Sequence, residues 1–339
     1  MKEYKRNNIN YGISILRVIL SLMVVFDHFY DYKTKIKFTY ILYYHIPTFF
    51  VLSFYFTYKT FISVHKVPKI KKRFERLLIP YFGWSIISWI LFNIYFYIFK
   101  EKVPHTVFSF LQHLLCGRIY FQVLWFQNIL ILITLIISII VLLFKKNQIL
   151  IFQILMIICL SLQYSGKNYK FFKKHFDSNY YMTYGRIVEA YPNAITGFFL
   201  SYINIYDKLK TNKRNTVLIN IIVLIFISKY KFDANLLSFR YGGLRRMSAA
   251  ICIFISFYFL PFENIKNEKI KKIINIIAGY NAGIYFIHCL IGRSKIMKKI
   301  LNRRIRKLSG FFSIYFISYI ICFILDKLIG NTFLKHMIK

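Results

Sequence analysis

YGISILRVILSLMVVFDHFY, residues 11–30, is the stretch from which the fold class of this chain follows. About 20 consecutive apolar residues in a helix cross the roughly 30 Å hydrocarbon core of a bilayer. The stretch ends in DHFY and lacks a small-residue cleavage site, so we expect it to remain a membrane span and not to be removed as a signal peptide. The sequence therefore predicts that the chain enters the membrane near residue 11.

The same pattern recurs along the chain. Apolar windows of similar length predict an all-α, polytopic bundle of about ten transmembrane helices. No soluble insertion is long enough to form a second domain, so we expect a single membrane-embedded domain over residues 1–339. The candidate spans are 11–30, 38–58, 78–99, 124–144, 147–164, 186–206, 216–231, 244–262, 273–292 and 308–329.

Composition narrows the class of protein further. Apolar residues make up 57% of the 339 positions, more than the 45–50% of an average soluble domain, which argues against disorder. Lys and Arg total 48 against 12 Asp and Glu, a formal charge of +36. Because the basic residues alternate with apolar spans, the charge predicts contact with anionic membrane lipids or a phosphate-bearing substrate and no nucleic-acid partner. Compositional drift toward A+T-rich codons is an alternative source of part of the charge.

The distribution of Lys and Arg also bears on topology, because cytoplasmic loops are enriched in these residues. The basic segment 293–307 has apolar residues at helical spacing, which is typical of an amphipathic helix at the membrane surface. Counted over all loops, Lys and Arg do not decide the orientation. With that segment left out of the count, they predict a multi-pass protein of the cell membrane with both termini in the cytoplasm.

The first span contains two ionisable side chains that are candidates for chemistry. Arg17 and His28 are 11 positions apart, or three helical turns plus about 20°, so they share one helix face about 16 Å apart. Charged groups in a bilayer are costly and often functional. A guanidinium can hold a phosphate, and an imidazole can act as a general base. The alternative is that Arg17 extends to the membrane surface and His28 is a polar residue at the end of the span.

A second basic cluster, KIKKRFERLLIPY at residues 69–81, ends where an apolar span begins. Arg73 and Arg76 are neighbours at i and i+3, so their guanidinium groups could bind one phosphate, with Lys72 beside them. A juxtamembrane topology signal is the alternative interpretation.

Other polar residues predict less chemistry. Arg186 and Glu189 are one turn apart, which favours a self-neutralising ion pair over a substrate contact. The five widely spaced cysteines predict neither a disulfide framework nor a metal site, and the histidines show no zinc-ligand spacing. We therefore expect no metal.

Residue by residue, the chain resembles the acyltransferase 3 family of integral-membrane O-acyltransferases. Arg17 and His28 match the Arg-x10-His signature of that family. Further matching segments follow in the order of the family: HIPTFFVLS at 45–53, Arg73-x-x-Arg76 with Pro80-Tyr81, LWF at 124–126 and GYNAGIYFIH at 279–288.

The resemblance implies transfer of an acyl group, usually acetyl from acetyl-CoA, to a hydroxyl of a cell-surface carbohydrate or a glycolipid. It implies that His28 and Arg17 are catalytic and that Arg73, Arg76 and Lys72 bind the coenzyme. The matching segments add Ser53, Trp125, Tyr285 and His288 as further site candidates.

One position departs from the family pattern. The family usually has glycine after the serine of the second span, whereas here Phe54 follows Ser53, and its ring would narrow a pocket or mark a divergent member. Two other functions remain open at this point. One is a transporter or flippase of an anionic or lipid-linked solute that uses the same basic groups, and the other is a non-catalytic membrane scaffold.

Overall fold

The structure is a computed structural model, and all the regular structure in its described part is helical. The described residues are 10–29, 44–61, 67–98, 110–111, 114–115, 117, 124–144, 146–164, 178–229, 242–262, 265–293, 308–330, 335 and 337–338. The helices are α1 (Tyr11–Phe29), α4 (His45–Phe61), α5 (Val67–Ile98), α7 (Leu124–Leu143), α8 (Gln148–Tyr164), α10 (Ser178–Tyr202), α11 (Ile205–Leu209), the 3-10 turn η1 (Lys210–Asn212), α12 (Lys213–Lys229), α13 (Leu244–Phe259), α14 (Glu268–Gly279), α15 (Asn281–Arg293) and α17 (Leu308–Ile329).

Four of these helices are long and apolar enough to cross a membrane. They are α1, α7, residues 70–94 of α5 and residues 309–329 of α17, and the bent pair α14–α15 makes a fifth if it counts as one span. The expected ten spans are therefore not confirmed. Helices α4, α12 and α13 have 17, 17 and 16 residues, fewer than the roughly 20 that a span needs. The helices that do qualify make this an integral membrane protein.

Several predicted boundaries differ from those of the helices. The structure has α5 beginning at Val67, so the basic cluster belongs to the same helix as the apolar span predicted at 78–99. The span predicted at 186–206 ends at Tyr202, because Asn204 takes a left-handed conformation with φ 51° and α11 starts anew. Residues 38–43, the start of the span predicted at 38–58, lie outside the described residues. So do residues 294–307, which make up most of the predicted amphipathic segment.

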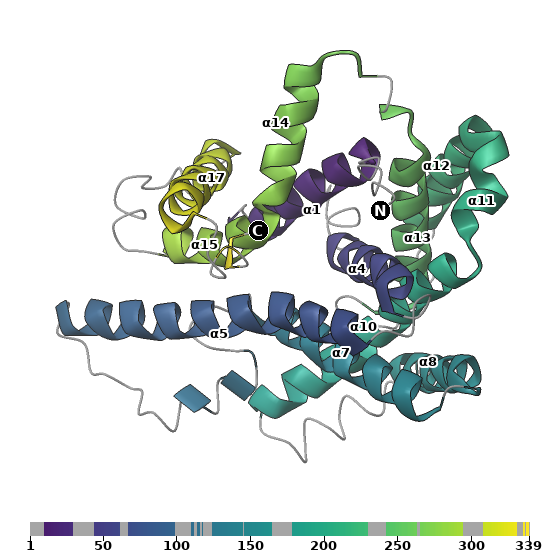
Figure 1. Cartoon of the computed structure of the whole chain (residues 1–339), viewed down its shortest axis with the longest axis horizontal. Coiled ribbons are helices and arrows are strands. Elements are labelled where there is room, and N and C mark those ends of the chain that lie inside the picture. Colours follow the sequence, from purple (N-terminus) through teal and green to yellow (C-terminus); the bar gives the residue numbers. More distant parts are fainter. Residues whose placement is uncertain are drawn as a thin grey trace, which may run out of the picture.

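Helix α1 lies inside the bundle. It packs against α4, α13, α14, α15 and α17, with α5 running along one side of the molecule and α11–α13 at one end (Figure 1). Asn10 caps its N-terminus by accepting a hydrogen bond of 3.0 Å from the Ile13 N–H, and the Asn10 amide donates to the Tyr258 carbonyl at 3.1 Å. These bonds fix where α1 begins against α13.

The span predicted at 273–292 is broken. Helix α14 ends at Gly279 and α15 begins at Asn281, with a bend of 60° between them. Tyr280 at the break donates a hydrogen bond of 2.8 Å to the Asp326 carboxylate of α17. Irregular backbone at membrane depth is tolerated where protein or a cavity surrounds it, and the break in this pair borders a cavity.

Candidate active site

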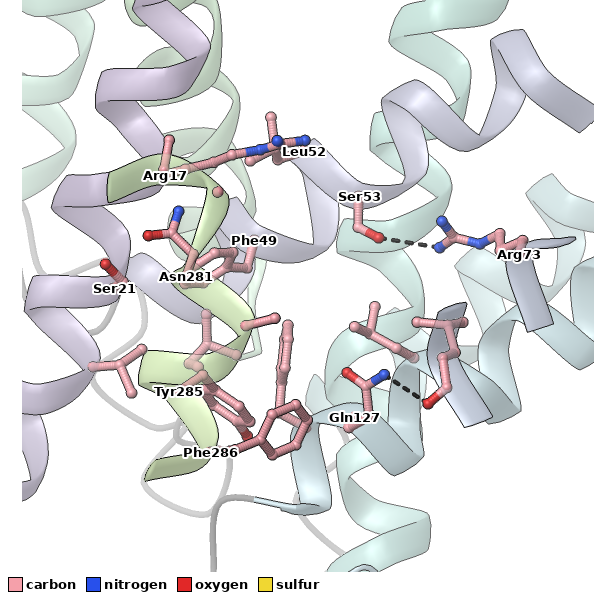
Figure 2. A pocket seen from close by; sticks show the side chains of 18 residues that line it. Arg17, Ser21, Phe49, Leu52, Ser53, Arg73, Gln127, Asn281, Tyr285 and Phe286 are labelled. Atoms are coloured by element: carbon pink, nitrogen blue, oxygen red, sulfur yellow. Dashed lines mark hydrogen bonds between the residues drawn. The ribbon is translucent and has the colours of Figure 1, made fainter. Parts of the chain in front are cut away.

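A cavity of about 420 Å³ lies among α1, α4, α5, α7 and the α14–α15 break, within the size range of small-molecule sites. Figure 2 shows Arg17, Ser53, Arg73 and Asn281 in one part of it and Tyr285 and Phe286 in another. The cavity therefore has a cationic, polar part and an aromatic part. The lining residues are Arg17, Ser21, Val24, Ile46, Phe49, Leu52, Ser53, Arg73, Leu77, Phe126, Gln127, Leu130, Ala278, Gly279, Asn281, Ala282, Tyr285 and Phe286.

One stripe of α1 faces this cavity. Arg17, Ser21 and Val24 line it, at spacings of four and three residues that keep side chains on one helix face. The next position in that series is His28, one turn beyond Val24. His28 is not among the described lining residues, so it extends the stripe beyond the end of the cavity. Of the two residues predicted to share this face, Arg17 lines the cavity and His28 does not, so their joint role stays a prediction.

Arg73 is the basic residue of α5 that lines the cavity, and three neighbours hold its guanidinium. Its Nη2 donates to the Ser53 hydroxyl at 3.1 Å and its Nε to the Thr134 hydroxyl at 3.4 Å. Its Cζ lies 5.2 Å from the centre of the Phe54 ring, within the range of a cation–π contact. The guanidinium is thus oriented by α4 and α7 before any ligand binds.

Phe54, at the position where the resemblance predicted glycine, has a defined place in the structure. Its ring is fully buried and is not among the residues that line the cavity. The Phe54 ring therefore does not narrow the cavity, contrary to expectation. The ring lies under the Arg73 guanidinium instead.

The other two basic candidates of α5 lie elsewhere on the helix. Lys72 and Arg76 are exposed and do not line the cavity, whereas Arg73 is half-buried. Successive helical residues point about 100° apart, so Lys72 faces away from Arg73, and Arg76 is offset from it by about 60°. The predicted phosphate cluster thus has one member in the cavity and two on the surface of α5.

His28 meets a second histidine at the end of the α1 stripe. The ring centres of His28 and His288 are 5.3 Å apart, and Tyr285, which lines the cavity, lies 6.1 Å from His288. His288 is fully buried, and its Nδ1 is 2.9 Å from the Ile284 carbonyl oxygen one turn earlier on α15. The signature histidine of α1 and the last histidine of the family-like segment at 279–288 therefore come together.

Three polar residues of the cavity were missed by the sequence analysis, namely Ser21, Gln127 and Asn281. Asn281, the first residue of α15, lines the cavity with both side-chain polar atoms buried and no hydrogen-bond partner in the described part of the protein. Gln127 donates from its amide to the Leu77 carbonyl at 3.0 Å and joins α7 to α5. The sequence carried a signal for Gln127, because an amide side chain inside an apolar span needs a hydrogen-bond partner in the membrane.

Trp125 lies in a neighbouring cluster and not in the cavity. The Arg186 guanidinium is 4.7 Å from the centre of its ring and forms a 3.0 Å ion pair with Glu189, which is buried. The predicted self-neutralising pair is confirmed.

Comparison with known proteins gives the family. The model of a family described as an acyltransferase domain, acyltransferase 3, matches residues 10–327. This chain belongs to the acyltransferase 3 family. The match includes every element of the cavity, and it makes the protein an acyltransferase of the membrane. No curated protein and no solved structure matches the chain.

Proposed function

We propose that this acyltransferase moves an acyl group, in the first place acetyl, from acyl-CoA to a hydroxyl of a cell-surface carbohydrate or a lipid-linked sugar. The observation that carries the proposal is the cavity. Two guanidinium groups line it, and none of the described residues that line it is a carboxylate. Such a site attracts an anionic ligand, and phosphates are the anions that arginine binds best.

The polar part of the cavity suits the donor. Arg17 and Arg73 flank it from α1 and α5, as Figure 2 shows, and we assign them to the coenzyme phosphates. Exposed Lys72 and Arg76 would attract the donor toward the same helix. Because acyl-CoA is a cytoplasmic metabolite, this end would face the cytoplasm, in keeping with the expected position of both termini.

Asn281 suits the middle of the donor. A carboxamide offers two hydrogen-bond donors and one acceptor, and at this residue neither polar atom has a partner among the described residues. The pantetheine arm of coenzyme A carries amide groups with the complementary pattern. We assign Asn281 to that arm, because a buried amide left unpaired costs about 1–3 kcal/mol.

His28 supplies the chemistry in this proposal. Its imidazole accepts the proton of the acceptor hydroxyl while the oxygen attacks the thioester carbonyl. The carbon–sulfur bond breaks, the coenzyme leaves as a thiolate, and the imidazolium returns the proton to that sulfur. A route in which His28 carries the acyl group itself uses the same residue. His288, Tyr285 and Ser53 are positioning residues in either route.

A transfer assay tests the proposal. Purified protein in lipid bilayers is incubated with acetyl-CoA radiolabelled in the acetyl group and with membrane glycolipid extracts. We expect label in the glycolipid fraction as an ester that mild alkali releases. Protein that binds acetyl-CoA but labels no carbohydrate or glycolipid would contradict the proposal. Movement of an anionic solute across the bilayer without acyl-CoA would favour the transporter alternative.

A further inference from the structure

Three side chains with metal-binding atoms converge where α1 meets α15. They are His28 of α1 and the adjacent His288 and Cys289 of α15, and their ligand atoms all lie within 4.8 Å of one another. Residues 28 and 288 are 260 positions apart, so sequence spacing could not indicate this cluster. It lies beyond the described cavity lining.

The spacing of these atoms is close to that of a zinc site. Bonds of about 2.3 Å to sulfur and 2.0 Å to nitrogen at a tetrahedral angle place the two ligand atoms about 3.5 Å apart. The Cys289 sulfur is 3.4 Å from His288 Nε2. The two ligand atoms that lie farthest apart are at most 4.8 Å from each other. This distance is at most about 1.5 Å longer than in a zinc site, and rotation of the partly exposed His28 side chain would close the difference.

The hydrogen bonding of His288 is a second, independent observation. A histidine that binds a metal through one ring nitrogen commonly donates the other N–H to a carbonyl or carboxylate. His288 has its Nδ1 2.9 Å from the Ile284 carbonyl oxygen, which fixes the tautomer with the lone pair on Nε2, toward Cys289.

The surroundings also suit a borderline-soft cation. His288 and Cys289 are fully buried, and the rings of Phe29 and Tyr285 lie about the two histidines. One thiolate and two imidazoles are a ligand set typical of zinc, with a fourth position open to water. Hard cations such as Mg²⁺ prefer oxygen ligands, so they would not compete at this site.

We propose that His28, His288 and Cys289 bind Zn²⁺ and that binding inhibits acyl transfer. The Cys289 S–H bond breaks, the sulfur bonds to zinc as a thiolate, and its proton passes to solvent. No electron is transferred. The inhibitory part rests on the proposed function, because zinc occupies the lone pair with which His28 would accept the hydroxyl proton. The binding part stands without it.

Cobalt replaces zinc as a spectroscopic probe in the first test. Co²⁺ is titrated into the purified full chain in bilayers, and we expect a near-ultraviolet thiolate-to-cobalt charge-transfer band that saturates at one ion per chain and disappears on addition of Zn²⁺. Cys289→Ser should lose the band. Cys252→Ser, which changes a buried thiol of α13 distant in the chain, should keep it. His288→Gln provides a second variant should Cys289→Ser fail to fold, and it should weaken binding at least about tenfold.

Two results would overturn the site. One is a wild-type titration without a charge-transfer band, and the other is a band of equal strength in Cys289→Ser. The second test measures acetyl transfer with Zn²⁺ and then with a chelator, and we expect inhibition that the chelator reverses and that Cys289→Ser weakens at least about tenfold. A cobalt band without zinc inhibition would keep the metal site and contradict the role of His28 as base.

Discussion

At the scale of residues, Arg73 shows how the cavity holds a charge in a fixed position. Its guanidinium is tied to Ser53 and Thr134 and lies over the ring of Phe54, so it loses little side-chain freedom when a phosphate binds. Arg17 approaches the cavity from the other side. The arrangement suits an extended anionic ligand better than a single small anion.

The Arg73→Ala variant should bind acyl-CoA more weakly. A hydrogen bond to a charged group contributes about 1.5–3 kcal/mol, so we expect the apparent KM for acyl-CoA to rise about tenfold to a hundredfold with a smaller change in kcat. Steady-state kinetics at saturating acceptor measure both constants. Arg76→Ala, which removes an exposed charge of the same helix, is the matched control and should change KM by less than a few-fold. An unchanged KM in Arg73→Ala would remove Arg73 from the phosphate site.

The Phe54→Leu variant tests the role of the ring under Arg73. Leucine keeps an apolar side chain in the core but removes the cation–π contact, which is worth about 0.5–2 kcal/mol. We expect the KM for acyl-CoA to rise about two- to thirtyfold while the protein still folds. Phe50→Leu changes a buried ring of the same helix that does not line the cavity and serves as the comparison. Equal effects of the two substitutions would show that Phe54 acts only through packing.

At the scale of elements, two backbones approach closely where α4 packs against α10. A Cβ added at Gly197 would fall on the carbonyl group of Val51, whose backbone cannot shift cheaply. Small residues at such contacts let membrane helices pack closely. This contact positions α4, and hence Ser53 and Phe54, against the rest of the bundle.

Gly197→Ala should therefore destabilise the protein. Overpacking costs about 1–3 kcal/mol, and we expect the midpoint of thermal unfolding in detergent to fall. Gly279→Ala is the matched control, because its added Cβ would meet no atom within 4 Å. If both variants melt at the wild-type temperature, the contact between α4 and α10 tolerates an added methyl group and is not closely packed.

The break between α14 and α15 is a feature of this scale that hydropathy could not predict. Hydropathy predicted an apolar segment at 273–292, but the break between Gly279 and Asn281 depends on contacts of Tyr280 with Asp326 and of the Gly283 N–H with the Ile338 carbonyl. Those partners are more than 40 residues away in the chain. Window averages carry no information about such contacts, and so the exposure of Asn281 to the cavity could not be predicted.

At the scale of the whole molecule, the sequence predicted the all-helical class and four of the residues that line the cavity. Arg17, Ser53, Arg73 and Tyr285 line the cavity because helical spacing and family motifs report which faces point inward. The meeting of His28 with His288 depends on how α1 packs against α15, which local patterns do not encode.

The predicted number of about ten spans is not confirmed. Apolar windows do not distinguish a helix that crosses the membrane from a shorter one packed among its neighbours. Nor do they show that a basic cluster, such as 69–76, continues the helix of the following span. The number of crossings therefore depends on the packing of the bundle.

The proposed mechanism of acyl transfer depends most on His28, and acetyl transfer by His28→Ala is its most direct test. The variant protein is reconstituted beside wild type, and transfer from radiolabelled acetyl-CoA to glycolipid is measured together with binding of acetyl-CoA. Loss of a general base typically costs about 10²- to 10⁴-fold in rate, so we expect transfer to fall by that factor while acetyl-CoA still binds. A His28→Ala protein that transfers acetyl at the wild-type rate would contradict the account.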